Sequence, residues 1–303
     1  MPTIFRLLTI TTLSIAVIIS CGQDKSKKIE KDLANESQQK AEQLKKDFNK
    51  AKQVFYSLPS PIETAMLIKR SGVDYDENLL NPLENQSKYV SSYKLAMNLG
   101  VYSANISYAS IFNQNQTSIK YMAAAKKLAE NLGILDAIDQ QTVERLENNI
   151  NNRDSLMDII SETFMNSDSF LKENGRPETA SLLIAGGWIE GLFLATQHAK
   201  LSPDNEEIID RITDQKISLQ SLIKLLDGYK ENKNVAMALE NLIKINKIYE
   251  NFTMVTTDMK SVTDNAERKT LLQAKSDVYH DKAHIEELTT VVDSIRTGIV
   301  QPD

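Results

Sequence analysis

Apolar residues recur at helical spacing along most of the chain. One long stripe lies between residues 85 and 113, where Tyr89, Met97, Val101 and Tyr108 fall on one helix face. Similar spacing predicts further helices at about 60–70, 117–131, 140–174, 177–201, 203–230, 233–255 and 266–297. β-branched residues rarely alternate with polar ones over a strand length. The pattern therefore predicts an all-α fold, a bundle or helical stack of about seven or eight helices with no sheet.

Capping and turn residues set several of the predicted helix ends. Ser60, Pro61 and Glu63 form a capping box, in which the serine and the glutamate each satisfy a free backbone amide at the helix start. Gly72 and Gly133 follow predicted helices and supply left-handed stops. Short connections between the helices favour antiparallel neighbours.

One predicted helix has a weak middle. Residues 148–154 are unusually polar within the helix predicted at 140–174. Such a segment lacks the apolar positions that would hold a continuous helix against a core. We therefore expect this helix to bend or break there.

The first twenty residues follow a different pattern. Arg6 precedes an uncharged run, Leu7 to Ser20, which is shorter than the about 20 residues of a membrane-spanning helix. A basic residue followed by a short apolar run is typical of a signal peptide. The run ends in Ile18-Ile19-Ser20-Cys21-Gly22, and Cys21 is the only cysteine of the chain.

This ending resembles the lipobox of bacterial lipoproteins, in which branched aliphatic residues and a small residue precede an obligatory cysteine. The resemblance implies that the signal peptide, residues 1–20, is cut before Cys21, that the Cys21 thiol receives a diacylglyceryl group, and that the freed amine is acylated. Several acyl chains hold a protein durably at a membrane, at about 0.8 kcal/mol per buried CH₂. The alternative is an incidental cysteine after an ordinary signal peptide or short membrane anchor.

The resemblance also bears on localisation. Gly22 and Gln23 follow the cysteine, and neither is the aspartate that in some Gram-negative lipoproteins signals retention in the inner membrane. We therefore expect a lipid-anchored protein of the bacterial cell envelope, placed at the outer membrane.

Charge and cysteine content bear on the possible partners and on disulfide bonds. The chain has 35 Lys and Arg against 41 Asp and Glu, a net charge of −6, which argues against a nucleic-acid partner. With one cysteine it forms no internal disulfide. Residues 21–57 read as a charged helical tether, either a solvated stalk or a basic segment that touches anionic headgroups. The all-helical domain would then span residues 58–303.

The most unusual stretch of the mature chain is LLIAGGWIEGLFLAT, residues 182–196. Gly187 and Gly191 fall four apart on one helix face, where missing side chains let another helix approach. Each glycine costs about 1 kcal/mol relative to alanine in a helix, so close packing must compensate. The alternative is a small-ligand pocket framed by Gly187, Trp188, Glu190 and Gly191.

Two of the three histidines form the only metal candidate. His280 and His284 stand four apart, so on a helix they would share a face and could hold one metal ion with Asp281 or Glu287. The segment lacks the glutamate of the His-Glu-x-x-His motif. The alternative is a pair of solvated histidines on a polar helix flank.

No sequence motif points to catalysis. The chain has no nucleophile elbow, phosphate-binding glycine loop or dinucleotide fingerprint. We therefore expect no enzyme activity and no cofactor, and a lipid-anchored interaction or scaffold module with a protein partner in the envelope. Two alternatives stay open: a ligand-binding module with a pocket near residues 185–195, and a metal-dependent enzyme using His280 and His284.

Overall fold

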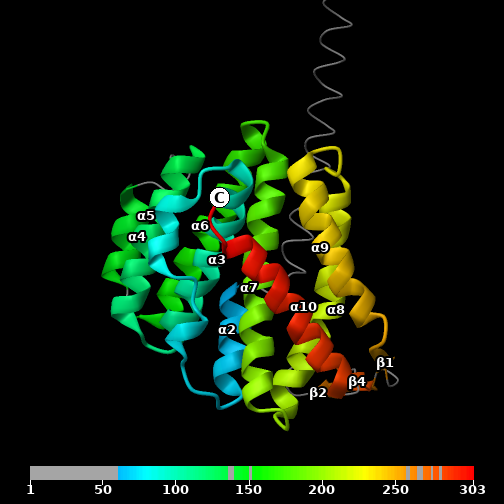
Figure 1. Cartoon of the computed structure of the whole chain (residues 1–303). Coiled ribbons are helices and arrows are strands. Elements are labelled where there is room, and N and C mark those ends of the chain that lie inside the picture. Colours follow the sequence, from blue (N-terminus) through cyan, green and yellow to red (C-terminus); the bar gives the residue numbers. More distant parts are fainter. Residues whose placement is uncertain are drawn as a thin grey trace, which may run out of the picture. The chain divides into compact units, whose positions relative to one another are not determined.

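Helices make up most of the part of the chain that the structure, a computed structural model, describes (Figure 1). The described residues are 61–135, 140–149, 152–256, 260–264, 269–273, 276–279 and 282–303. The helices are α2 (Pro61–Arg70), α3 (Ser92–Ile111), α4 (Asn115–Leu132), α5 (Gln140–Asn148), α6 (Arg153–Glu173), α7 (Pro177–Leu201), α8 (Glu206–Asp227), α9 (Lys233–Tyr249) and α10 (Lys282–Val300). The predicted all-α class is confirmed.

The signal peptide predicted at 1–20, Cys21 and the tether predicted at 21–57 lie outside the described residues, so these predictions stay untested. The described residues belong to one compact unit, residues 51–303.

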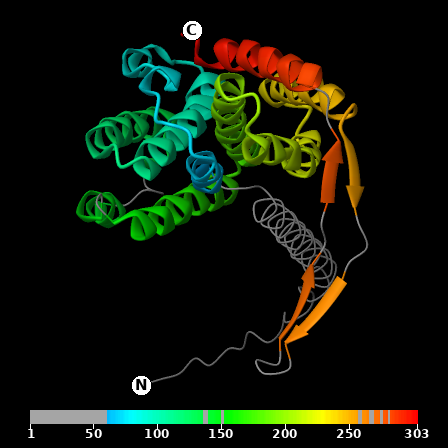
Figure 2. The same ribbon diagram turned by 90° about the horizontal axis from the view of Figure 1, so that it is seen from below.

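The segment between α9 and α10 corrects the expected absence of a sheet. Four short strands lie there, in two antiparallel pairs (Figure 2). The strands are β1 (Thr253–Thr256), β2 (Lys260–Asp264), β3 (Lys269–Gln273) and β4 (Ser276–Tyr279). β1 pairs with β4, and β2 with β3. The helices predicted at 233–255 and 266–297 are therefore shorter, because this segment is rich in Thr and Val, which favour extended backbone.

Most predicted helix ends are confirmed. α2 begins at Pro61, although its capping residue Ser60 lies outside the described residues. Gly72, Gly133 and Gly175 follow α2, α4 and α6 with φ angles of 79°, 70° and 69°. Glycine adopts this left-handed conformation without steric cost, which explains why the helices stop there.

The helix predicted at 140–174 is broken, as its polar middle indicated. α5 ends at Asn148, and α6 begins at Arg153 after Asn152, whose side chain accepts a hydrogen bond from the Ser155 amide. Asparagine is a preferred helix-capping residue because its side-chain oxygen satisfies a free backbone amide.

Two helices begin later than predicted for the same reason. Ser91 caps α3, so the helix predicted from 85 starts at Ser92 and is preceded by a short 3₁₀ helix, Leu83–Lys88. Asn205 caps α8, so the helix predicted from 203 starts at Glu206. In both cases a capping side chain fixed the start.

α3 and α7 form the centre of the domain, and both are buried almost all round. Figures 1 and 2 show α7 between the α2, α3 and α8 helices, with α10 packed across it. Among the described residues α7 alone is long and apolar enough to cross a membrane, but 94% of its most apolar window is buried by the rest of the domain. This burial is typical of a core helix.

The two central helices touch through glycines. A Cβ at Gly100 of α3 would overlap the Leu183 carbonyl oxygen of α7, and a Cβ at Gly186 would overlap the Met97 carbonyl oxygen of α3. Neither position can hold a side chain without separating the helices. The glycine stretch thus serves close helix packing, through Gly186 more than through the predicted Gly191, which meets Thr64 of α2 at ordinary contact distance.

Candidate functional site

The four residues predicted to frame a pocket point to different neighbours. The Trp188 indole Nε1 donates to the Ser218 hydroxyl of α8 at 3.1 Å. The Gly187 backbone lies against Gly100 of α3, and Gly191 faces α2. Glu190 is paired with Arg296 of α10. These four residues therefore do not line one cavity.

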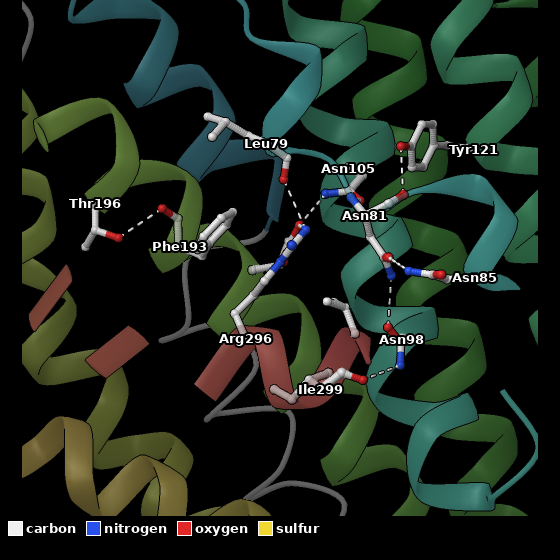
Figure 3. A network of polar contacts seen from close by, with 12 residues as sticks. Leu79, Asn81, Asn85, Asn98, Asn105, Tyr121, Phe193, Thr196, Arg296 and Ile299 are labelled. Carbon is white, nitrogen blue, oxygen red and sulfur yellow. Dashed lines mark hydrogen bonds and ion pairs between the residues drawn. The ribbon is translucent and has the colours of Figure 1, made fainter. Parts of the chain in front are cut away.

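Glu190 belongs to a network of buried polar groups. Figure 3 labels its partners Arg296 and Asn105. It is fully buried, and its two carboxylate oxygens accept from Arg296 Nε at 2.9 Å and Arg296 Nη2 at 3.0 Å. The Asn105 amide of α3 donates to the same carboxylate at 2.7 Å, and Arg296 Nη2 also donates to the Leu79 carbonyl at 3.0 Å. A bidentate, hydrogen-bonded pair of this kind satisfies both charges inside the protein.

Asn81, in the loop that precedes α3, connects this loop to the network. Its backbone amide donates to Asn105 Oδ1 at 3.0 Å, and its side-chain amide donates to Asn98 Oδ1 at 3.0 Å. The Tyr121 hydroxyl of α4 donates to the Asn81 carbonyl at 2.8 Å, and the Asn98 amide donates to the Ile299 carbonyl at 3.0 Å. The network therefore joins the loop before α3 to α3, α4 and α10.

The electrostatics fit a structural role. Burial by itself disfavours the charged guanidinium, but the Glu190 carboxylate and its hydrogen bonds raise the pKa of Arg296. The guanidinium also lies 4.4 Å from the centroid of the Phe193 ring, a cation–π distance. Every polar group named here has a partner within the protein, so the network fixes helix positions.

An apolar cleft with a volume of about 300 Å³, which we call the α3–α6 cleft, lies among the described helices. Residues of α3, α4, α5 and α6 line it, together with Leu183 of α7. Its lining residues are Leu99, Ser103, Ile106, Ile119, Met122, Ala123, Ala125, Lys126, Leu146, Ile160, Thr163, Ser167 and Leu183. A volume of this size falls at the small end of the range for small-molecule sites.

The hydroxyl groups of the cleft are bound to their own helices. Ser103 donates to the Leu99 carbonyl, Thr163 to the Ile159 carbonyl and Ser167 to the Thr163 carbonyl, at 2.8, 2.7 and 2.9 Å. Each of these hydroxyls donates to the backbone carbonyl four residues earlier. The described lining residues therefore present mainly carbon to an occupant.

The sequence signal for this cleft is a second, mainly apolar stripe on α4, which was not among the residues predicted to form a site. Ile119, Met122, Ala123 and Lys126 follow the helical spacing i, i+3, i+4 and i+7. They lie beside the core stripe, which includes Leu128. Ile119 is 40% exposed, so this second stripe is not covered by the domain.

The metal candidates are only partly described. His280 and Asp281 lie outside the described residues, so their pairing with His284 stays a prediction. His284 lies on α10 with its ring centroid 6.0 Å from that of Phe252, and its buried Nδ1 has no hydrogen-bond partner among the described residues. Within the described ranges, no three His, Cys, Asp or Glu side chains gather as a metal site.

Comparisons of the chain with protein-family models, curated proteins and solved structures find no match.

Proposed function

We propose that the chain is a lipid-anchored, non-enzymatic module of the bacterial cell envelope that binds an apolar molecule in the α3–α6 cleft. The observation that carries this proposal is the cleft itself, about 300 Å³ of space whose hydroxyls are committed to their own helices. The anchor rests on the resemblance of the Cys21 region to a lipobox.

The lining chemistry favours binding over catalysis. Acid–base and nucleophilic catalysis use side chains such as imidazole, carboxylate or thiol in reach of the substrate. The described lining residues supply carbon, back-bonded hydroxyls and one ammonium group, Lys126. Such a surface recognises shape and apolar area.

Ligand binding was the sequence-based alternative to an interaction or scaffold module, and we place the ligand in a different site. The ligand-binding alternative placed a pocket near residues 185–195, but Trp188 and Glu190 are bonded to α8 and α10. The cleft opens between other helices, and α7 contributes only Leu183 among its described lining residues. An interaction with a protein partner in the envelope stays a prediction.

Photolabelling of the full-length protein in bacterial membranes tests the binding site. A neutral alkyl diazirine is expected to insert into cleft-lining residues of α4 and α6, mapped by proteolysis and mass spectrometry. Ala123→Trp fills the cleft from an exposed lining position and is expected to abolish this insertion. Asn131→Trp adds the same side chain to an exposed position of α4 outside the cleft lining, and is expected to leave labelling unchanged.

Equal labelling of the wild type and both variants would overturn the cleft as the binding site. Labelling restricted to residues outside the cleft would overturn it too.

The anchor has its own test. The intact mass of the full-length protein from the membrane fraction is expected to equal the chain from Cys21 plus two or three acyl groups. Cys21→Ser is expected to leave an uncut, unlipidated precursor. A Cys21→Ser variant that is processed and membrane-bound like the wild type would contradict the anchor.

A further inference from the structure

We propose that the occupant of the α3–α6 cleft is a single-chain amphiphile with an anionic headgroup, such as a free fatty acid, with its chain against the apolar walls and its headgroup at Lys126. This inference rests on the proposed function, because it names the ligand class of the same site.

The volume supports one chain. A methylene group occupies about as much space as a water molecule, roughly 30 Å³. A cleft of about 300 Å³ therefore holds on the order of ten methylene groups. One medium-length chain therefore fits in the cleft.

The positions along α4 give the occupant a direction. Ile119 and Lys126 both line the cleft and lie seven residues apart on this helix, about 10 Å along its axis. Met122 and Ala123 lie between them. The apolar stripe is thus about as long as an extended chain of this size, and the lysine stands at one end of it.

The positive charge of Lys126 at that end favours an anionic headgroup. Lys126 is exposed and is the one charged side chain among the described residues that line the cleft. Glu130, four residues further along α4, is hydrogen bonded to Lys127 at 2.8 Å and also interacts electrostatically with Lys126. A lysine stem can cover apolar surface while its ammonium group stays in water, where it would meet an anion.

Matched photoprobes test the headgroup in the full-length protein in membranes. One probe is dodecanoic acid and the other is dodecylammonium, each with a diazirine in the chain. The measured quantity is the probe concentration that gives half-maximal labelling of cleft peptides. The acid is expected to label the wild type at a lower concentration than the ammonium probe does.

Two exposed lysines of α4 supply the matched variants. Lys126→Gln is expected to raise the half-maximal concentration of the acid by roughly threefold, the size expected of an exposed ion pair. Lys120→Gln removes the same charge from an exposed α4 position outside the cleft lining and is expected to change nothing. The ammonium probe is expected to label Lys126→Gln and the wild type at the same half-maximal concentration.

Equal labelling by the acid and the ammonium probe would overturn the anionic headgroup and leave the proposed function intact. Cleft labelling by a diacyl phospholipid diazirine at the same concentration as the acid would overturn the single chain. If the neutral alkyl probe also failed to label the cleft, the proposed function itself would fall.

Discussion

The centre of the domain and its α4–α6 side use polar groups in opposite ways. At the centre, Arg296 and Asn105 both donate hydrogen bonds to Glu190 and so join three helices, and the α3 and α7 backbones touch at Gly100 and Gly186. At the α3–α6 cleft, hydroxyls bond back to their own helices, and about 300 Å³ between the helices stays open. The first arrangement ties helices together, and the second leaves a surface for another molecule.

The contrast separates structural from functional sequence features. The sequence favoured close helix packing for the glycines, with a ligand pocket that includes Glu190 as the alternative. The structure has the glycines in helix contacts and Glu190 in a buried ion pair. The stripe from Ile119 to Lys126 was not predicted as a site, and it lines the cleft. Buried polar groups that are fully paired specify how helices meet, whereas an uncovered apolar stripe marks a binding surface.

Removing one partner of the central ion pair is expected to have the largest effect. Arg296→Met leaves the fully buried Glu190 carboxylate with one remaining hydrogen bond, from Asn105. Breaking a buried pair in this way costs about 3–5 kcal/mol of the free energy of unfolding. Denaturant unfolding followed by circular dichroism measures the loss.

The double variant Glu190→Gln with Arg296→Met is the control, because it removes both charges. It is expected to be more stable than Arg296→Met alone. A single variant within about 0.5 kcal/mol of the wild type, the range of ordinary surface changes, would contradict the structural role of the network.

The glycine contact is expected to give the next largest effect. Gly186→Ala places a methyl group against the Met97 backbone and is expected to destabilise the domain by about 1–3 kcal/mol, the usual cost of overpacking. Gly191→Ala in the same helix is the matched control, because its Cβ would lie 3.4 Å from the Thr64 Cγ2 atom. It is expected to be neutral or to stabilise by up to about 1 kcal/mol through helix propensity. Equal unfolding midpoints for both variants would show that the helices can separate freely.

A smaller effect is expected from pH, through His198 of α7. His198 is 2% exposed, and its Nε2 lies 2.8 Å from the Tyr108 hydroxyl, which accepts a hydrogen bond from the Asp76 amide. A neutral His198 with Nε2 unprotonated accepts the hydroxyl proton in this hydrogen bond. Burial lowers the pKa of His198, although the Asp76 carboxylate opposes this shift.

The sign of the pH effect follows from proton uptake. Below the unfolded-state pKa of about 6.5, the unfolded chain takes up a proton at His198 that the folded domain resists. The contribution of neutral His198 to the free energy of unfolding is therefore fully present above about pH 6.5. It is lost as the pH falls toward the lower folded-state pKa. His198→Gln is expected to show a smaller loss between pH 7 and pH 5 in denaturant unfolding. An unchanged pH dependence in the variant would contradict this assignment.

Local sequence rules predicted much of the fold. Gly72, Gly133 and Gly175 fixed helix ends, and the polar residues around 148–154 predicted the break between α5 and α6. The late starts of α3 and α8 were missed because Ser91 and Asn205 are caps that only the backbone geometry distinguishes from other polar residues. The strands between α9 and α10 were missed because short β-branched segments carry a weak periodic signal.

The candidate site was harder to predict, because it depends on contacts between distant segments. Nothing local in the sequence indicates that Glu190 meets Arg296, 106 residues away. The α4 stripe is readable at helical spacing, but whether other helices cover it is decided by the tertiary packing. A stripe becomes a cleft only where the neighbouring helices leave it open.

The central claim is that the cleft holds a small amphiphile, and the most direct measurement is mass spectrometry of small molecules extracted from the purified full-length protein. A single-chain anion is expected in the wild type and in Asn131→Trp, at about one per protein chain, and is expected to be depleted from Ala123→Trp. The same extracted molecules in equal amounts from all three proteins would contradict the claim.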